Sequence, residues 1–300
     1  MQLLAFVLAY PFLWCVSMLP FRALYIFSDI ICFFVYHVFG YRKQTVRKNL
    51  EIALPHLSIT ERRTIEKKFF RHMCDMFLEM IKTMNISDKE IKDRFVFTNM
   101  EMIREYEEKG KSVALLCAHY ASWEWLVVMA KYTSFRSIAI YKKIGNKYFD
   151  KLVRKIRSRL HAELVESKKS IELIQYNNAN KIKAFYGFAS DQSPQLSKAK
   201  YWDQFMGLVH TGAEMLAKKL DLNVLFVKVE KVKRGHYQAT LMPLVENPKS
   251  VPDYEITSIY LREVEKQILE APEYYFWTHN RWKHSGKKKA TDKTMNVPTL

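Results

Sequence analysis

Cysteine is scarce in this sequence, and the few cysteines present form no recognisable pattern. Only four occur among 300 residues, and no two of them are spaced as a Cys-x-x-Cys pair. Two of the four, Cys15 and Cys32, lie in the apolar N-terminal region. A zinc site or a disulfide framework needs closely spaced or numerous cysteines, so the sequence argues against both. The pattern fits a protein of a reducing compartment.

Internal repeats, long linkers and an excess of acidic residues are also missing. A chain of 300 residues without repeats or linkers predicts one main domain with a single sizeable core. Lys and Arg outnumber Asp and Glu by 48 to 31, which gives a formal net charge of +17. A charge of this sign predicts an anionic partner: a nucleic acid, a membrane surface, or an acidic protein or substrate.

Charge is absent from residues 1–21, which are dominated by large apolar side chains. The run is long enough to cross a hydrocarbon core of ~30 Å, and no Lys or Arg precedes it, which argues against a cleaved signal peptide. A second apolar run, residues 23–41, follows Arg22 and ends at a basic cluster. This cluster predicts that the rest of the chain is cytoplasmic by the positive-inside rule. Its members are Arg42, Lys43, Arg47 and Lys48.

We interpret residues 1–41 as a helical membrane-anchoring segment. Pro11 and Pro20 interrupt it, so three structures remain open at this point. They are a membrane-spanning helix, a helix that lies in the membrane interface, and a buried core helix. The first two attach the protein to a membrane, and only the third does not.

From residue 42 onward the hydrophobic pattern alternates between helix and strand. Helical spacing over residues 45–50 and 58–84 is followed by short apolar runs separated by helical ones. This alternation predicts an α/β layered domain over residues 42–285, and residues 286–300 form a basic tail that we expect to be disordered. The expected strands are 113–118, 137–141, 163–166, 184–190, 223–230 and 236–243, and the later helices are 146–160, 170–178, 212–220 and 254–270.

One strand-to-helix junction carries a candidate catalytic pair. Residues 113–118 read as a buried strand, helical spacing begins near Trp125, and His119 and Glu124 lie between them. Within one helix, residues five apart point about 140° away from each other. His119 and Glu124 can therefore meet only if the turn bends His119 back over the helix start, where Ser122 is the expected N-cap. A histidine paired with a carboxylate suits general-base catalysis, and the alternative is a histidine that satisfies a buried helix end.

The same His-x4-Glu spacing occurs at His56 with Glu61 and at His161 with Glu166. The spacing alone is therefore weak evidence for catalysis. Neither of these two pairs opens a helix directly from a buried strand, so the context favours His119 as the catalytic histidine.

The expected helix 146–160 carries a group of cationic side chains. Arg154, Arg157 and Arg159 lie mostly off its apolar stripe. Such a group fits either a solvated basic face or contacts to a phosphate or an oxyanion.

Two further stretches contain side chains that suit substrate binding. Asp191 and Gln192 follow an apolar strand, where polar residues in open α/β sheets face the ligand crevice, although an ordinary turn has the same composition. Residues 277–283 combine aromatic and cationic side chains. This combination suits a membrane interface or phosphate groups, and equally an exposed C-terminus.

An ordered set of short motifs extends over nearly the whole chain after the apolar N-terminus. The set comprises Tyr41-Arg42, Asn49-Leu50, His119-x4-Glu124, Tyr141-Lys142, Arg157-x-Arg159, Asp191-Gln192, Phe205-Met206-Gly207, Thr211-Gly212 with Leu216-Ala217, and Trp277-x-His279-x-Arg281-x-Lys283. In this order the motifs resemble the bacterial lipid A biosynthesis acyltransferases, the late lauroyl and myristoyl transferases. These belong to the wider glycerolipid acyltransferase group with its HX4D/E motif. The resemblance implies a mixed sheet flanked by helices, with an N-terminal helical membrane anchor.

The resemblance also implies an activity and a location. The expected reaction moves a fatty acyl group from an acyl carrier protein or CoA thioester to a hydroxyl of a lipid A precursor, which is an anionic membrane lipid. Neither a metal nor a cofactor is implied, and no nucleic acid partner. The expected location is the bacterial inner membrane, with the catalytic domain on the cytoplasmic face.

Roles for individual residues follow from the same resemblance. His119 would act as general base and Glu124 would orient it. Arg157 would contact the developing oxyanion or a lipid phosphate, and Asp191 would hold Arg157 or the acceptor. The further residues expected to bind substrate are Lys142, Arg154, Arg159, Gln192, His279, Arg281 and Lys283.

The sequence departs from the usual family pattern at several positions. They are Ala118 for Asn, Ala121-Ser122 for Gly-Asn, Lys142 for Arg, His161 for Gly, and Met206 for Phe. The His–Glu pair is retained, but the acceptor stays open, so a lysophospholipid or an amino-acid lipid is an alternative to a lipid A precursor. A second alternative is a non-catalytic, membrane-tethered protein that binds anionic lipid or nucleic acid. It explains the net charge but not the arrangement of strand, histidine, helix and glutamate.

Overall fold

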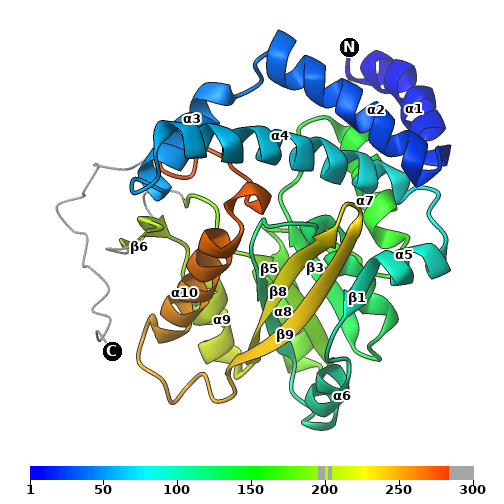
Figure 1. Cartoon of the computed structure of the whole chain (residues 1–300). Helices are drawn as coiled ribbons and strands as arrows, with labels where there is room; N and C mark the ends of the chain where they lie inside the picture. The colour runs from blue at the N-terminus through cyan, green and yellow to red at the C-terminus, as the bar shows by residue number, and fades with distance from the viewer. Residues whose placement is uncertain (195–199, 202–204, 284–300) are drawn as a thin grey trace.

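The structure is a computed structural model that describes residues 1–194, 200–201 and 205–283. Its centre is a seven-stranded mixed sheet with the strand order β1-β9-β8-β2-β5-β3-β4 (Figure 1). Neighbouring strands in it are parallel, except that β8 and β9 pair antiparallel as a hairpin. The strands are β1 (Phe95–Phe97), β2 (Val113–Cys117), β3 (Arg136–Tyr141), β4 (Glu163–Glu166), β5 (Ala184–Ala189), β8 (Asn223–Lys233) and β9 (His236–Val245).

This architecture confirms the predicted α/β fold with a mixed sheet between helices. Every strand expected from the apolar runs is present, and β4 has the predicted bounds. The strand β1 was not predicted, because three residues are too few to show a period of two. The predicted tail, residues 286–300, lies outside the described residues.

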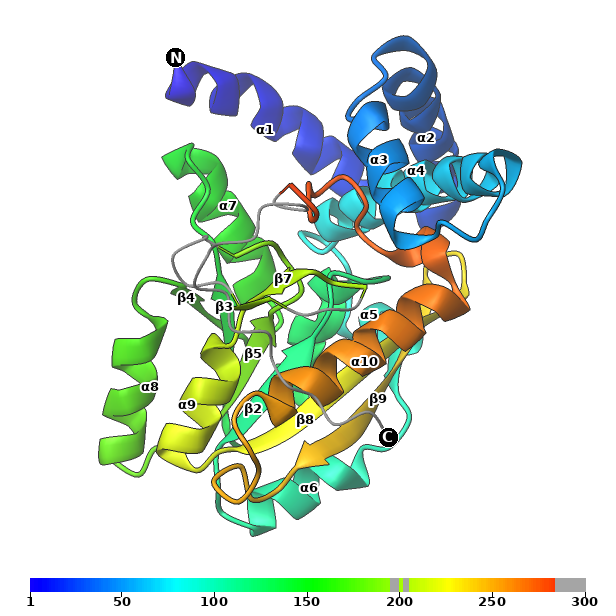
Figure 2. The same ribbon diagram turned by 90° about the vertical axis from the view of Figure 1, so that its left-hand side faces the viewer.

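Helices cover both faces of the sheet (Figures 1 and 2). On one face, Tyr260 of α10 packs against Phe226 of β8, with ring centroids 5.9 Å apart. On the other face, Trp125 of the 3-10 helix η2 packs edge-on against Tyr237 of β9, with ring centroids 5.8 Å apart. The main helices are α3 (Lys43–Ala53), α4 (Ile59–Lys82), α5 (Asp88–Arg94), α6 (Glu101–Glu108), η2 (Trp123–Lys131), α7 (Lys147–Ser158), α8 (Ser170–Ala179), α9 (Gly212–Leu220) and α10 (Glu255–Glu270).

Two short elements complete the fold near the C-terminus. The strands β6 (Lys200–Tyr201) and β7 (Leu208–Val209) form a separate antiparallel pair. The 3-10 turn η4 (Pro272–Tyr274) follows α10 and lies against α4. This contact brings the C-terminal segment over the end of the central strand β2, where His119 is expected.

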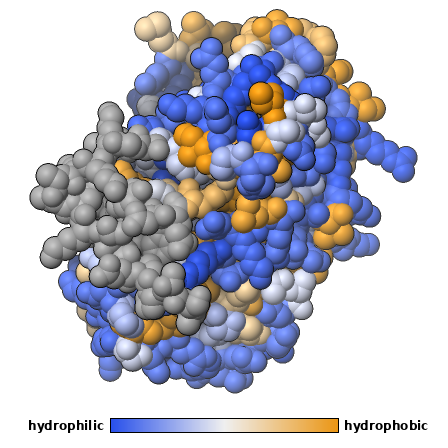
Figure 3. All heavy atoms as spheres, turned by 60° about the vertical axis from the view of Figure 1, so that its left-hand side comes forward, coloured by the Kyte–Doolittle hydropathy of each residue, from blue (hydrophilic) through white to orange (hydrophobic). Residues whose placement is uncertain are grey.

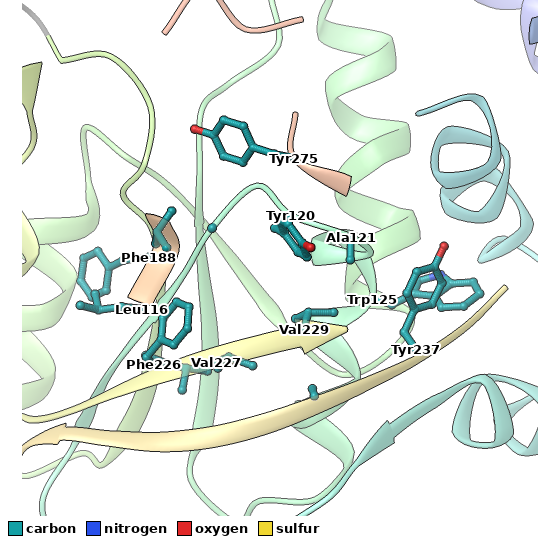
Figure 4. Close-up of a cluster of buried hydrophobic side chains, with 14 of the residues drawn as sticks. Leu116, Tyr120, Ala121, Trp125, Phe188, Phe226, Val227, Val229, Tyr237 and Tyr275 are labelled. Atoms are coloured by element: carbon teal, nitrogen blue, oxygen red, sulfur yellow. The ribbon is translucent and has the colours of Figure 1, made fainter. Parts of the chain in front are cut away.

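The core of the sheet explains why β2 occupies its middle. Val113 and Ala114 have no solvent exposure, since β5 and β8 flank the strand and helices cover both of its faces. Figure 4 shows Leu116 and Phe226 gathered on one side of the strand, with Trp125 and Tyr237 together farther along the sheet. A near-continuous apolar run is the sequence that such a doubly covered strand requires.

The N-terminal apolar run forms two helices rather than one. α1 (Gln2–Met18) ends before Pro20, and α2 (Phe21–Phe33) continues through a π turn to Val38. Among the described helices, one stretch, Phe21–Val38, is long and apolar enough to cross a membrane by length and composition. Its mean hydropathy is 1.5.

The helix α2 docks along α4 through polar contacts. Tyr25 donates to a Glu79 carboxylate oxygen at 2.8 Å, and Ser28 donates to Asp75 at 2.7 Å. Leu24, the residue before Tyr25, is fully buried. The inner face of α2 is therefore part of the domain, while its outer face stays apolar and exposed.

Candidate active site

His119 lies two residues after β2, in a turn that the C-terminal segment holds in place. Ala121 has a positive φ of 48°, which redirects the chain sharply from the strand into η2. Its N–H donates to the Tyr274 carbonyl at 2.9 Å, and the Phe276 N–H donates to the His119 carbonyl at 3.0 Å. The turn thus owes its shape to residues far along the chain as well as to its own sequence.

The carboxylate that holds His119 is that of Asp191. His119 Nδ1 lies 2.6 Å from Asp191 Oδ1, and the backbone N–H of His119 donates to Asp191 Oδ2 at 3.0 Å. The cause is strand register: Cys117 of β2 pairs with Ala189 of β5, so the residues two positions later lie side by side. Polar residues at the carboxyl ends of parallel strands meet in this way at one edge of an α/β sheet.

This contact fixes the tautomer of His119. With the Nδ1 proton donated to Asp191, the lone pair of the neutral ring is on Nε2. Nε2 lies 3.1 Å from the side-chain nitrogen of Gln192, which is in position to donate to it. The arrangement leaves Nε2 as the nitrogen that can accept a proton from another group.

The electrostatic environment makes His119 more basic than an ordinary histidine. Burial by itself lowers its pKa, but the Asp191 carboxylate and, to a smaller extent, Glu124 outweigh burial, so the pKa of His119 is raised. Burial favours a raised pKa for Asp191, but His119 and its hydrogen bonds outweigh that effect, and the pKa of Asp191 is lowered. Asp191 therefore stays ionised and stabilises a protonated His119.

The predicted pairing of His119 with Glu124 is wrong in this structure. Glu124 instead forms a two-pronged ion pair with Arg157 of α7, with Nε–Oε2 and Nη2–Oε1 distances of 2.8 and 2.7 Å. The turn does bend back, but η2 directs Glu124 towards α7, where the guanidinium matches both carboxylate oxygens. Glu124 lies close enough to raise the pKa of His119 without touching it. Asp191, expected to hold Arg157 or the acceptor, contacts His119.

The start of η2 also differs from the prediction. The helix is 3-10 rather than α over Trp123–Lys131, and Ser122 precedes it without a capping hydrogen bond from its side chain. Instead, the Ser122 carbonyl accepts from the Trp125 N–H at 3.1 Å, the i to i+3 bond of a 3-10 turn. The tighter winding keeps Trp125 buried against the sheet and Glu124 facing α7.

Two arginines that were expected to bind substrate serve the fold. Arg159 donates to the backbone carbonyls of Thr83 and Ile86 at 3.1 and 2.5 Å, which ties α7 to the end of α4. Arg281 is only 2% exposed and donates to the Leu208 carbonyl at 2.7 Å. The buried position of Arg281 does not fit a direct substrate-binding role, although its charge helps to lower the pKa of Asp191. Arg159 is exposed, so its role in substrate binding stays a prediction.

The remaining predicted residues lie around the site at different depths. The ring nitrogen Nε2 of His279 accepts from the Ser193 N–H at 3.1 Å, and burial lowers the pKa of His279 to about 4, so that it stays neutral. Lys142 is exposed and lines the rim of the cavity described next. Arg154 and Lys283 are exposed to solvent.

A cavity of about 500 Å³ opens beside His119 and extends between the sheet, η2 and α7. His119, Glu124, Arg157 and Gln192 line its polar end. Apolar residues from β2, β3, β5 and η2 line the rest, among them Leu115, Leu126, Met129, Ile138, Phe185 and Gly187. The site thus combines the basic nitrogen of His119 with room for an apolar group, a layout typical of small-molecule pockets.

Comparison with known proteins gives a family for this arrangement. Residues 2–284 match the family of bacterial lipid A biosynthesis acyltransferases. This chain belongs to that family. It is 25% identical over 276 residues to the lipid A biosynthesis lauroyltransferase of Escherichia coli (strain K12). The aligned region covers 90% of this chain and 89% of that protein. It is 21% identical over 246 residues to the lipid A biosynthesis palmitoleoyltransferase of the same strain, covering 81% and 79%.

Membership in this family makes the protein an acyltransferase and sets aside the interpretation as a non-catalytic binding protein. The HX4E motif of the chain is His119-x4-Glu124, and the structure brings its two members to one cavity without a bond between them. The two relatives carry names with different acyl groups, lauroyl and palmitoleoyl.

Three residues of this acyltransferase site escaped the sequence analysis. Trp123 and Phe276 stand beside His119, with ring centroids 5.4 and 6.4 Å from its imidazole, and His210 also lines the cavity. Trp123 precedes Glu124 directly, so its position at the junction was an available signal. Phe276 and His210 gave none, because their places depend on how the C-terminal half folds back over β2.

Proposed function

We propose that this acyltransferase moves a fatty acyl group from a thioester to a hydroxyl of a lipid A precursor, with His119 as general base. One observation carries the proposal: the contact with Asp191 leaves Nε2 of His119 unprotonated at the polar end of a largely apolar cavity. The nitrogen can accept the proton of the acceptor hydroxyl, and the cavity can hold the hydrocarbon chain of the donor. The names of the two relatives support the acceptor class.

The reaction follows from these positions. As the acceptor oxygen attacks the thioester carbonyl carbon, its proton passes to Nε2 of His119 and the new C–O bond forms. The tetrahedral intermediate then collapses, the C–S bond breaks, and the proton on His119 passes to the leaving thiolate. Asp191 stabilises the imidazolium between these steps, as a buried carboxylate does in hydrolase triads.

Arg157 is the group we assign to the developing oxyanion. Glu124 takes two of its five N–H donors, Nε and one on Nη2, which leaves the others for a ligand. The bond to Glu124 fixes the plane of the guanidinium, so the remaining donors need little reorganisation when charge develops. Glu124 thus acts as a positioning residue for Arg157.

The donor thioester and the membrane are both anionic partners for a chain with a net charge of +17. Acyl carrier protein and CoA both present negative charge near the thioester. Exposed cations lie on α7 and just before it, and one of them, Lys142, lines the cavity, so the group would attract either donor. These cations are Lys142, Lys143, Lys147, Lys151, Arg154 and Lys155.

The N-terminal helices provide the membrane-binding surface in this proposal. Figure 3 shows hydrophobic residues gathered at the top of the molecule, where α1 and α2 lie in Figure 1. Phe6 of α1 contacts Tyr148 and Phe149 at the start of α7, so this apolar surface adjoins the basic one. An apolar face beside cations suits the inner membrane with its cytoplasmic anionic lipids, and the docking of α2 on α4 favours helices that lie in the interface.

Charges placed on α1 are expected to release the protein from membranes. Leu4 and Leu8 are 63% and 70% exposed on one face of α1, and carboxylates there would enter the apolar layer at a cost of several kcal/mol. The double variant Leu4→Glu/Leu8→Glu should bind vesicles of anionic phospholipid at least about tenfold more weakly. Flotation with the vesicles measures this.

The matched control places the same charges on a different surface. Ile171 and Leu269 are 52% and 47% exposed, on α8 and α10. The variant Ile171→Glu/Leu269→Glu should bind vesicles as the unaltered protein does. Equal loss in both double variants, or no loss in either, would count against α1 as the binding surface. Removal of residues 1–41 is a poorer test, because it would also delete the buried Leu24.

The proposed reaction can be tested with the purified protein. Acyl carrier protein thioesters and acyl-CoA are supplied separately, with a lipid A precursor, a lysophospholipid or an amino-acid lipid as acceptor, and the lipids are examined by mass spectrometry. Transfer to the lipid A precursor supports the proposal, and transfer only to another acceptor moves the enzyme to the alternative substrate class. Absence of transfer with every pair would refute it.

A further inference from the structure

Small residues open a passage across the middle of the cavity floor. The sheet pairs Leu115 of β2 with Gly187 of β5, Gly187 with Ala139 of β3, and Ala139 with Leu164 of β4. These four residues form a row on the face that η2 covers, and all of them line the cavity. At the centre of the row, Gly187 has no side chain and Ala139 only a methyl group.

The next row towards the amino ends of the strands is different. Phe185 lies two residues before Gly187 on the same face of β5, pairs with Ser137 of β3, and is 1% exposed. Its ring packs against Phe135, with centroids 5.9 Å apart. The cavity therefore passes the Gly187 row and meets an aromatic side chain at the Phe185 row.

We propose that the missing side chain at Gly187 lets the acyl chain pass and that Phe185 closes the end of its space. The enzyme would then take long-chain donors of up to about sixteen carbons. This inference rests on the proposed function. An extended hydrocarbon advances roughly 1.25 Å per carbon, given C–C bonds of ~1.5 Å at angles near 111°. Leu115 lies four residues before His119. Val113, which pairs with Phe185, lies six residues before His119. At about 3.3 Å per residue these depths are about 13 and 20 Å, or about ten and sixteen carbons.

The backbone at Gly187 accepts a side chain without strain. A Cβ built there would meet its nearest neighbours, the Ile138 carbonyl oxygen and the Ala139 Cα, at 3.7 and 3.9 Å, which is ordinary contact. Gly187 lies inside a regular strand, where a β-branched residue is favourable. Gly187→Val should thus fold and place two methyl groups in the passage.

A competition assay tests the proposal on the full-length protein. Equimolar acyl thioesters of 8 to 18 carbons are supplied with a lipid A precursor, and the products are counted by mass spectrometry. By the depths above, the unaltered enzyme should prefer chains longer than about ten and up to about sixteen carbons. Gly187→Val should lose use of 14- and 16-carbon chains at least about tenfold relative to 10-carbon chains, and Ala139→Val should act in the same direction. Phe185→Leu should raise the use of 18-carbon chains.

The control adds the same side chain outside the cavity. Gly145 is exposed, and a Cβ there meets nothing within 4 Å, so Gly145→Val should keep the original chain preference. If Gly187→Val lowers the use of every chain length in parallel, or leaves the preference unchanged, the proposal is wrong while the acyltransferase function stands. Failure of the unaltered enzyme to use any thioester would instead count against the proposed function itself.

Discussion

His119→Ala is expected to remove nearly all acyl transfer while leaving the fold intact. Proton removal by a positioned histidine contributes a factor of about 10² to 10⁴ to a rate. Among the described histidines that line the cavity, His119 is the one whose ring is held by a carboxylate. The loss of the ring leaves the buried Asp191 carboxylate without its Nδ1 partner, so some stability should be lost, while the His119 backbone N–H still donates to Asp191 and the turn should persist. Transfer of a labelled acyl group to lipid measures activity, and circular dichroism with thermal unfolding checks the fold.

The two other histidines with the same spacing to a glutamate provide controls. His56 is exposed between α3 and α4, and His161 is exposed after α7. His161 has a positive φ of 71°, so Asn, which tolerates that conformation, is the better replacement than Ala. His56→Ala and His161→Asn should keep most of the activity. Substantial turnover by a folded His119→Ala protein would remove the histidine from the mechanism.

Local sequence was sufficient for the elements but not for the order in which the strands lie. The local hydrophobic pattern gave β4 and α9 their observed bounds. The order β2-β5-β3 places a later strand between two earlier ones, and nothing in a run of residues encodes that neighbour. The contact between His119 and Asp191 depends on this order, which is why the sequence suggested Glu124 as the partner instead.

The N-terminal segment contains polar residues whose spacing indicates a docked helix face. Asp29 is a charged residue within the second apolar run. In the structure it pairs with Arg71 and Arg234 at 3.0 and 2.7 Å. Residues at neighbouring turns, Tyr25 and Ser28, bind α4. Polar residues at helical spacing on one side of an apolar run indicate a docked face, so the run was amphipathic in a way that average hydropathy hides.

The form of the 3-10 helix could not be read from the sequence. Over the nine residues of η2, periods of 3.0 and 3.6 differ too little to be told apart by apolar spacing. What decides the winding is tertiary: Trp125 donates to the Thr83 hydroxyl of the segment after α4 at 2.9 Å. Glu124 is the adjacent residue, so this anchor also determines that Glu124 faces Arg157.

Asp191→Asn and Glu124→Gln should both reduce activity, but they should move the pH profile differently. As a base, His119 works only when neutral, so kcat/KM should rise with pH through its raised pKa and level off above it. Asn at position 191 removes the largest influence that raises this pKa, and it no longer selects the Nδ1–H tautomer. The rise should therefore shift to lower pH, and the plateau should fall about 10² to 10⁴-fold, as it does when a triad carboxylate is lost.

Glu124→Gln acts through Arg157 instead. The amide cannot match both guanidinium donors, so the oxyanion donors lose their orientation, and the plateau should fall about 10 to 10²-fold. Because Glu124 contributes less than Asp191 to the raised pKa of His119, the rise with pH should stay closer to its original position. Arg157→Met should lower the plateau to a similar extent, but it removes a cation that lowers the pKa of His119, so its small shift of the rise should be towards higher pH. Arg154→Met, which changes an exposed residue of the same helix, should leave the plateau unchanged.

The pH profiles of the two variants distinguish Asp191 from Glu124 as the working partner of His119. Loss of activity alone does not, because both variants should lose activity. A purely structural role for Asp191 would lower activity and thermal stability together without displacing the pH rise. A displacement seen with Glu124→Gln and not with Asp191→Asn would make Glu124 the working partner, through a rearrangement on substrate binding. The distances favour the opposite result, because Asp191 already holds both the ring nitrogen and the backbone N–H of His119, at 2.6 and 3.0 Å, while both oxygens of Glu124 are taken by Arg157.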